Sequence, residues 1–286
     1  MRATNRMPVA LTIAGFDPSG GAGVLADIKT FTSFGCFATA AVTSLTFQNT
    51  TGVFGAAHQT AETVRAQVLP VVEDFQVAGV KTGMLPTREV IVEVARLLRE
   101  TPLHEIAPVV DPVVRSTSGY DLIDDDALAA LQSELLPLAR VVTPNIPEAE
   151  RLTGLRIATE ADMRRAASVI REMGARAVLV KGGHLLTGDA LDLLDDGGQV
   201  RLFRAPRITT DATHGTGCTL AAAIAAGLAR GLNLATAVEA AKRFVIAAIR
   251  QSPHLGRGFS PVNHSIRVRF DESGVVVIAG EFEDIK

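Results

Sequence analysis

The segment 213–219 holds the residue pattern with the most direct chemical meaning in this chain. It precedes a long alanine-rich stretch and reads Thr213-His214-Gly215-Thr216-Gly217-Cys218-Thr219. Glycines let a backbone approach a ligand closely, and the first N–H groups of a helix have no partner within the helix. Such a turn suits an anion, most naturally a phosphoryl group that gains charge during transfer. The pattern therefore predicts an anion site at the start of a helix.

A second glycine-rich segment, residues 15–23, follows an apolar run. Gly21-Ala22-Gly23-Val24-Leu25-Ala26 matches the dinucleotide pattern G-x-G-x-x-G/A, which would indicate a nicotinamide oxidoreductase. However, five residues separate Gly15 from Gly21, whereas the fingerprint turn is tight, and the next strand ends at Phe47-Gln48 without an acid for a ribose hydroxyl. The plainer interpretation is a loop whose helix start exposes backbone N–H groups to some other ligand.

The elements that must position these residues form an alternating series. Short β-branched runs alternate with helical patterns, which indicates an α/β fold with a central, mostly parallel sheet flanked by helices on both faces. Strands are expected at Val9–Ala14, Thr39–Thr46, Val77–Lys81, Pro108–Asp111, Arg140–Thr143 and Ala177–Lys181. Helices are expected at Gly23–Phe34, Ala61–Val72, Thr87–Glu100, Asp125–Leu136, Pro147–Thr153 and Glu160–Met173.

After Lys181 the pattern changes. The runs Ala190–Leu194 and Val200–Phe203, joined by residues 195–198, predict a β-hairpin, and two long helices follow at about Gly217–Ala229 and Leu234–Arg250. A terminal hairpin is expected within residues 265–286, from Ile266–Phe270 and Val275–Ile278. No linker interrupts the series, so residues 1–286 are expected to form one domain.

Ligands of open α/β sheets bind at the carboxyl ends of the strands. The residues that directly follow the runs are therefore expected to share one site. They are Gly15 through Gly23, Gln48-Asn49, Gly83-Met84, Asp111-Pro112, Asn145 through Glu148 and Gly182-Gly183-His184.

Composition excludes several classes of protein. The chain has 286 residues, of which 47% are hydrophobic, and this is too apolar for a disordered chain. Its two cysteines do not make a disulfide scaffold and point to a reducing compartment, so we expect a cytoplasmic protein. A net charge of −3 gives no basic surplus of the kind that binds nucleic acid or an anionic membrane surface. The longest uncharged apolar stretch, Leu220–Ala229, is about half of a bilayer span.

Several motifs together resemble a known family. They are the segment 213–219, the opening Leu-Thr-Ile-Ala-Gly-x-Asp-Pro-Ser-Gly-Gly-Ala-Gly, Gln48-Asn49-Thr50, Lys81-Thr82-Gly83-Met84, Asp111-Pro112-Val113, Thr143 through Ala149, and Val180 through His184. In this order they are similar to the hydroxymethylpyrimidine/phosphomethylpyrimidine kinases of thiamine biosynthesis, of the ribokinase-like superfamily. The resemblance covers about residues 9–264. It implies phosphorylation of a pyrimidine hydroxymethyl group and then of the monophosphate, with ATP and Mg²⁺, by a homodimer.

The resemblance assigns the pyrimidine to residues near the first strands. Gln48 is the choice for recognition, because a carboxamide complements the ring nitrogen and amino group of an aminopyrimidine; otherwise it caps a strand end. Asp27 would bond the hydroxymethyl or amino group, or else is a helix-dipole partner. Gly15 would offer a backbone contact and Met84 an apolar wall, unless Met84 is core filler. Val113 completes this predicted substrate set.

The resemblance assigns the phosphates to the remaining residues. Asp111 and Glu148 would hold Mg²⁺, which takes few protein carboxylates, although Glu148 could instead complement a helix dipole. Lys181 would reach the ATP phosphates, unless it faces solvent, and Thr213, Thr216 and Asn145 would join it in nucleotide binding. Gly215, Gly217 and Cys218 form the predicted catalytic set. A helix N-terminus lowers a thiol pKa, so Cys218 is a candidate for a thiolate base. However, phosphoryl transfer through a loose transition state depends little on a base.

Some residues stay open. His214 either touches phosphate or shapes its loop, and Phe16 stands where relatives carry a small residue. Where many relatives read Asp-Pro-Val-Met-Val-Ala-Lys-Ser-Gly, residues 111–119 lack the lysine, and Arg115 is its candidate replacement. Two further functions compete with the leading one: a pyridoxal kinase, whose substrate is also a six-membered nitrogen heterocycle with a hydroxymethyl group, and a catalytically silent pyrimidine-binding regulator.

Overall fold

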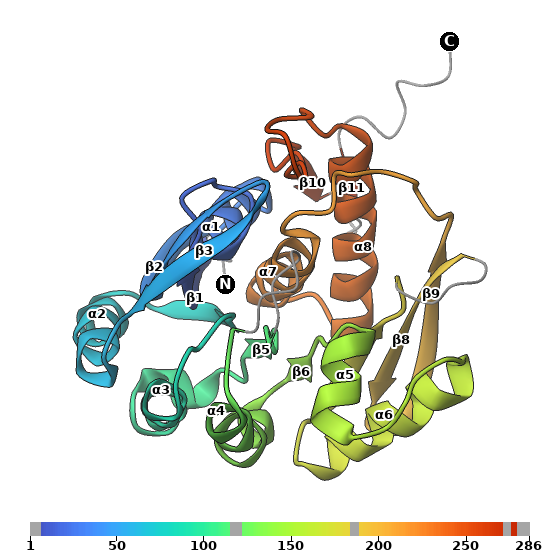
Figure 1. Cartoon of the computed structure of the whole chain (residues 1–286). Coiled ribbons are helices and arrows are strands. Elements are labelled where there is room, and N and C mark those ends of the chain that lie inside the picture. The colour runs from blue at the N-terminus through green and yellow to red at the C-terminus, as the bar shows by residue number, and fades with distance from the viewer. Residues whose placement is uncertain (1–6, 115–121, 184–188, 271–275, 279–286) are drawn as a thin grey trace, which may run out of the picture.

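The computed structural model describes residues 7–114, 122–183 and 189–270 together with the backbone of residues 276–278. Arg115, His184 and the turn expected at residues 271–274 lie outside the described residues. Within them, one nine-stranded sheet has the strand order β3-β2-β1-β4-β5-β6-β7-β8-β9 (Figure 1). The strands are β1 (Val9–Phe16), β2 (Phe37–Asn49), β3 (Gly52–His58), β4 (Val77–Thr82), β5 (Val109–Val110), β6 (Val141–Val142), β7 (Ala177–Lys181), β8 (Ala190–Asp196) and β9 (Gln199–Ala205).

The sheet is parallel in its centre and antiparallel at its two ends. Strands β2, β1, β4, β5, β6 and β7 run parallel, whereas β3 pairs antiparallel with β2, and β8 and β9 add an antiparallel hairpin after β7. The predicted mostly parallel sheet is confirmed. The same direction of six strands brings their carboxyl ends to one edge, as the sequence requires for a shared site.

Helices cover both faces of the sheet (Figure 1). Apolar residues of α2 (Ala61–Asp74), α3 (Arg88–Glu100), α4 (Asp125–Ala130), α5 (Ile146–Thr153) and α6 (Glu160–Glu172) form one buried core with the sheet. Those of α1 (Gly23–Ser33), α7 (Thr216–Ala229) and α8 (Leu234–Arg250) form the other. Alanine dominates the buried part of α7, which lets this helix lie close to the sheet and to α8.

Two elements differ from the sequence predictions. Strand β3 is absent from them because Gly52, Gly55 and two alanines weaken its β pattern. A Cβ at Gly55 would lie 3.0 Å from the Phe47 ring on β2, so a larger residue there would displace this exposed ring. The helix expected at Asp125–Leu136 is α-helical only to Ala130 and then passes through a π turn and a 3₁₀ turn. Pro137 lacks the N–H that an α-helix would need there.

The two strands of the predicted C-terminal hairpin are present in the structure. Strand β10 (Val268–Phe270) pairs antiparallel with β11 (Val276–Ile278), so the pairing is confirmed for the described part. No helix of the described residues is long and apolar enough to cross a membrane.

Candidate active site

A cavity of about 700 Å³ lies at the carboxyl edge of the parallel strands. Its walls come from the loops after β1, β4, β5, β6 and β7, from β2, from the residues after β9, and from α7 and α8. Of the fourteen residues assigned from the sequence to substrate, nucleotide, metal or catalysis, the structure brings all except Asp27 to this cavity: Gly15, Gln48, Met84, Asp111, Val113, Asn145, Glu148, Lys181, Thr213, Gly215, Thr216, Gly217 and Cys218.

Helix α7 begins in the middle of the cavity without a capping side chain. Its N-cap is Gly215 with φ +80°, and no side-chain hydrogen bond satisfies its first N–H groups. Helix α1 also begins without a capping side chain, whereas side chains cap α2, α3, α4, α5, α6 and α8. A Cβ at Gly215 would lie 1.7 Å from the carbonyl oxygen of Gly21, so only glycine fits between the two glycine-rich loops. The open N–H groups face the cavity, as predicted for an anion site.

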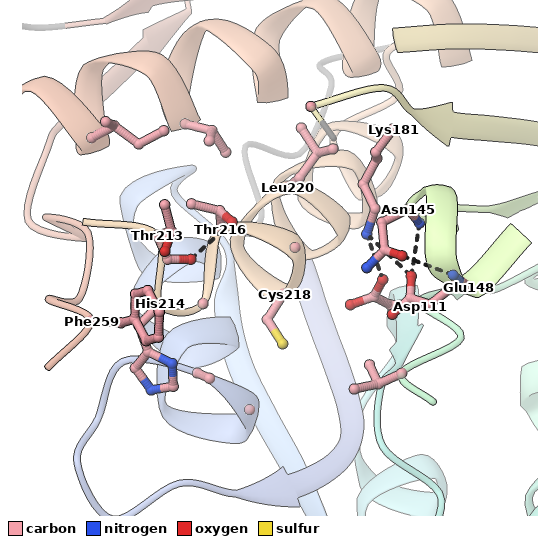
Figure 2. Close-up of a pocket in the computed structure, with 18 of the residues that line it drawn as sticks. Asp111, Asn145, Glu148, Lys181, Thr213, His214, Thr216, Cys218, Leu220 and Phe259 are labelled. Atoms are coloured by element: carbon pink, nitrogen blue, oxygen red, sulfur yellow. Dashed lines mark hydrogen bonds and ion pairs between the residues drawn. The ribbon is translucent and has the colours of Figure 1, made fainter. Parts of the chain in front are cut away.

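Cys218 projects from the first turn of α7 into the cavity (Figure 2). Burial raises the pKa of its thiol to about 11, although the Lys81 ammonium and the backbone N–H of Gly23 favour the thiolate. The expected lowering of this pKa by the helix N-terminus is therefore wrong, because desolvation and two nearby carboxylates outweigh it. Near neutral pH the thiol carries its proton.

On one side of Cys218, two carboxylates surround a single lysine (Figure 2). Lys181 Nζ lies 3.1 Å from Asp111 Oδ1 and 3.9 Å from Glu148 Oε2. Both acids are nearly inaccessible to solvent, and Lys181 is 13% exposed. Burial raises the pKa of Glu148 to about 7 despite Lys181, and the neighbouring Asp111 adds to the rise. Lys181 faces this cluster rather than bulk solvent, and we call these three residues the donor cluster.

The donor cluster has the composition expected of a magnesium site. Its two carboxylates carry one more negative charge than Lys181 balances, and both line the cavity. Among the described residues no group of three or more His, Cys, Asp or Glu side chains converges on a metal position. Two hard oxygen donors fit Mg²⁺, which keeps several of its waters. Asp111 and Glu148 would hold the ion.

The positions of these acids follow from local structure. Asp111 directly follows β5, and Thr143 donates a hydrogen bond to its Oδ1 at 3.1 Å. Glu148 lies in the first turn of α5 and closes a capping box with Asn145: the Glu148 N–H donates to Asn145 Oδ1, and the Asn145 N–H donates to Glu148 Oε2. Asn145 therefore holds Glu148 in place, besides lining the cavity.

The cavity also contains the residues predicted to bind the pyrimidine, apart from Asp27. Gln48 comes from β2, and its carboxamide has no hydrogen-bond partner among the described residues. Met84 lies beside Gly15, where a Cβ would approach the Met84 sulfur to 3.1 Å. Val113 and Phe16 also line this end. The space is narrow and mostly apolar, with one free carboxamide.

Asp27 lies behind this wall in a buried ion pair that the sequence did not predict. Its carboxylate Oδ2 accepts hydrogen bonds from Lys81 Nζ at 2.8 Å and from the Thr12 hydroxyl at 2.6 Å. The side chains of both Asp27 and Lys81 are completely buried, yet Lys81 lines the cavity and Asp27 does not. The substrate contact predicted for Asp27 stays a prediction. Lys81 appears in a motif, but its sequence position carries no sign of this partner.

The two glycine-rich loops are joined by Asp17 and His214. Asp17 accepts hydrogen bonds from the backbone N–H groups of Ser19, Gly21 and Ala22, and its Oδ2 lies 2.8 Å from His214 Nε2. Burial alone would raise the pKa of Asp17, but the hydrogen bonds from His214 and Ser19 outweigh it and lower the pKa to about 2. In this structure His214 shapes its loop.

The far end of the cavity is apolar and was not identified from the sequence. Ile208, Leu220, Val245, Ile246 and Ile249 line it, with contributions from α7 and α8. On helices these residues have the spacing of core residues, so no sequence signal separates them from the core. Lys242 on α8 joins this end through a 2.6 Å ion pair with Asp192 on β8.

Comparisons with known proteins agree with this site. A family model described as phosphomethylpyrimidine kinase matches residues 17–263. The hydroxymethylpyrimidine/phosphomethylpyrimidine kinase of Streptomyces coelicolor is 48% identical over 257 residues, which are 90% of this chain and 94% of that protein. The thiamine biosynthesis bifunctional protein ThiED of Geobacter sulfurreducens is 50% identical over 254 residues, 89% of this chain, and the chain spans about half, 51%, of that protein.

A solved structure also aligns with the whole sheet. It is an ADP complex of Bacillus subtilis pyridoxal kinase, with a TM-score of 0.83 and 37% sequence identity over 91% of this chain and 98% of that one. The parallel sheet, the cavity at its carboxyl edge and the uncapped start of α7 together define a ribokinase-like small-molecule kinase. The chain belongs to the phosphomethylpyrimidine kinase family. The predicted fold and family are confirmed, and the nicotinamide alternative is set aside.

Proposed function

We propose that this kinase transfers the terminal phosphoryl group of ATP to 4-amino-5-hydroxymethyl-2-methylpyrimidine and then transfers a second one to the monophosphate. These reactions supply the pyrimidine branch of thiamine diphosphate biosynthesis. The observation that carries the proposal is that one cavity contains Cys218 at the uncapped start of α7, the donor cluster and the free carboxamide of Gln48. We assign ATP to the donor cluster, the pyrimidine to the surroundings of Gln48, and the phosphoryl group in transfer to the start of α7.

The acceptor side accounts for recognition of the pyrimidine ring. The Gln48 carboxamide pairs with the ring nitrogen and amino group, and Met84 and Val113 cover the apolar surface of the ring. Gly15 offers backbone contact in the narrowest part of the pocket. Asp27 is assigned to the same substrate through its Oδ1, which is buried and has no hydrogen-bond partner.

The donor side accounts for binding of ATP. The apolar end between α7 and α8 receives the adenine, while Lys181, Thr213, Thr216 and Asn145 are directed to the phosphates. Asp111 and Glu148 would hold Mg²⁺, which would supply positive charge to offset that of the phosphates. The N–H groups at Gly215, Gly217 and Cys218 stabilise the phosphoryl group in transfer, because positioning and charge stabilisation dominate such reactions.

The protonated Cys218 constrains the first transfer. With a thiol pKa of about 11, Cys218 holds its own proton in the resting site. Only its minor thiolate form, which the Lys81 ammonium favours, can accept the proton of the reacting hydroxyl, and it does so as the hydroxyl oxygen bonds to phosphorus and becomes acidic. Proton removal is then late, as a loose transition state requires.

The substrate is tested by comparing two alcohols. Purified protein is incubated with ATP and Mg²⁺ and either the hydroxymethylpyrimidine or pyridoxal, and ADP release is measured. We expect a higher kcat/KM with the pyrimidine. A higher kcat/KM with pyridoxal would favour a pyridoxal kinase, the alternative supported by the likeness to the Bacillus subtilis enzyme. Tight pyrimidine binding without ADP release would favour the silent regulator.

We also propose a cytoplasmic homodimer. Both cysteines, Cys36 and Cys218, are free, as in proteins of reducing compartments. Strands β2 and β3 at the sheet edge expose four large apolar side chains, Phe37, Leu45, Phe47 and Phe54. A second copy would cover this surface. Light scattering tests the assembly: a mass of twice 30.1 kDa is expected, and a mass of 30.1 kDa contradicts it.

A further inference from the structure

The buried pair of Lys81 and Asp27 lies under the acceptor end of the cavity. Lys81 on β4 and Thr12 on β1 are direct neighbours in the sheet, and both bond to Asp27 Oδ2 on α1. Neither Lys81 nor Asp27 has any accessible side-chain surface. Water therefore does not screen the field of this pair.

The pair is oriented with its positive end toward the reacting groups. Lys81 lines the cavity, whereas Asp27 lies behind it. A Cβ on Gly83 would come within 2.6 Å of Lys81 Nζ, so the glycine gives the ammonium room at the floor. The Lys81 charge reaches Cys218, where it favours the thiolate over the thiol. A negative charge beside Cys218 is stabilised in the same way.

The ammonium group also has hydrogen-bonding capacity to spare. A lysine ammonium has three donors, and among the described residues Lys81 Nζ has a single hydrogen-bond acceptor, Asp27 Oδ2. Although burial disfavours the charged form, Asp27 and the other anionic groups nearby keep the pKa of Lys81 above its usual value. Lys81 is therefore a permanent cation at this place.

We propose that Lys81 determines specificity for the second acceptor: its charge stabilises the phosphate monoester of the pyrimidine, and it matters less for the neutral alcohol. This inference rests on the proposed function, since it assumes that one site takes both acceptors. The alcohol brings no charge to the floor of the cavity. The monophosphate brings up to two negative charges to the same place, next to the charge of the incoming phosphoryl group.

The second transfer differs from the first in its protons as well. An oxygen of the acceptor phosphate forms a bond to the terminal phosphorus of ATP, and the bond from that phosphorus to the bridging oxygen breaks, with its electron pair leaving on ADP. The doubly ionised acceptor has no proton to lose, so this step needs no base. It needs a cation that offsets repulsion between two phosphates, and Lys81 is placed to supply it.

The test removes the pair as a unit, because either charge left alone in the core would destabilise the fold. In Lys81→Met/Asp27→Leu, kcat/KM is measured for the alcohol and for the monophosphate at saturating ATP and Mg²⁺. Loss of Asp27 affects both acceptors, which share one pyrimidine, so the ratio of the two values isolates Lys81. We expect the monophosphate-to-alcohol ratio to fall about tenfold or more, as for removal of an electrostatic contact to the transition state.

Matched variants separate this effect from general damage. Lys242→Met/Asp192→Leu removes a second lysine–aspartate pair that lines the far end of the same cavity, and its ratio should stay unchanged. If thermal unfolding shows that the first variant is not folded, Lys81→Gln/Asp27→Asn replaces it with a neutral hydrogen-bonded pair.

The outcomes are distinct. An unchanged ratio in the Lys81 variant, or an equal fall in the Lys242 variant, would overturn the proposal and leave Lys81 a structural residue. Absence of transfer to both acceptors in the unmodified chain would instead refute the proposed function, and the inference with it.

Discussion

Two lysine–carboxylate groups near Cys218 look alike in composition and differ in charge balance. In the donor cluster, Lys181 faces two acids and stays partly open to the cavity. In the buried pair of Lys81 and Asp27, Lys81 faces a single acid, and neither side chain is accessible to solvent. The first has a surplus negative charge that a divalent cation can satisfy, and the second is already neutral. Charge balance, more than residue type, thus separates a site that can bind a metal ion from a buried ion pair whose electric field acts on the cavity.

The largest expected effect comes from the donor cluster. Asp111→Asn removes one of two carboxylates and should lower kcat/KM by about 10³-fold, because the metal and the charge stabilisation that it supplies are lost together. The Mg²⁺ concentration for half-maximal rate should rise as well. Glu73→Gln, at an exposed position on α2, is the matched control and should change neither value. Equal Mg²⁺ dependence in Asp111→Asn and the unmodified chain would contradict the metal role.

The two lysines should differ in their effect on stability. Lys81→Met leaves the Asp27 carboxylate unpaired in the core and should lower the free energy of unfolding by about 3–5 kcal/mol. Lys181→Met should cost less, since the Lys181 side chain is 13% exposed and water can reach the carboxylates that it leaves, whereas Lys81 and Asp27 are completely buried. Urea unfolding at pH 7 measures both. Equal losses of unfolding free energy in the two variants would contradict the distinction between the neutral Lys81–Asp27 pair and the donor cluster with its surplus negative charge.

Cys218 lies between the two groups and tests the proton step. Cys218→Ala should lower kcat with the alcohol by about 10²-fold, the low end for general base catalysis, with far less effect on ATP affinity. The loss with the monophosphate should be smaller, because that acceptor has no proton to lose. Cys36→Ala, at the buried free cysteine, should leave kcat unchanged. Unchanged turnover of the alcohol in Cys218→Ala would exclude the base role.

The smallest effect is a shift in the pKa of Cys218 itself. Since its pKa is about 11, roughly 10⁻³ of the thiol is ionised at pH 8, and alkylation by iodoacetamide should accelerate with pH up to about pH 11. Lys81→Met/Asp27→Leu removes the Lys81 charge, which lowers this pKa, together with the weaker opposing effect of Asp27, whereas Asp111→Asn removes a charge that raises it. Measured in a Cys36→Ala background, the rate near pH 9 should be higher in the Asp111 variant than in the Lys81 variant. The reverse order would contradict the assigned charges.

Much of the fold follows from sequence patterns, because periodicity and turns act locally. Strand β7 and helix α8 have the predicted bounds, and the loops after the strands meet at one edge as the parallel order requires. Strand β3 was not predicted, because its glycines and alanines weaken the β pattern, and the contact of Gly55 with the Phe47 ring involves another strand. The predicted site residues share one cavity, apart from Asp27. Its pairing with Lys81, 54 positions away, depends on the packing of α1 against the neighbouring strands β1 and β4, which no local pattern reveals.

The central claim, two transfers to one pyrimidine by one site, is tested most directly by ³¹P NMR of a single reaction. The unmodified chain is mixed with the hydroxymethylpyrimidine, Mg²⁺ and more than two equivalents of ATP, and the phosphorus signals are followed over time. We predict a monoester signal that rises and then falls as the signals of the pyrimidine diphosphate appear. A monoester that accumulates without any diphosphate, or no new signal at all, would contradict the account.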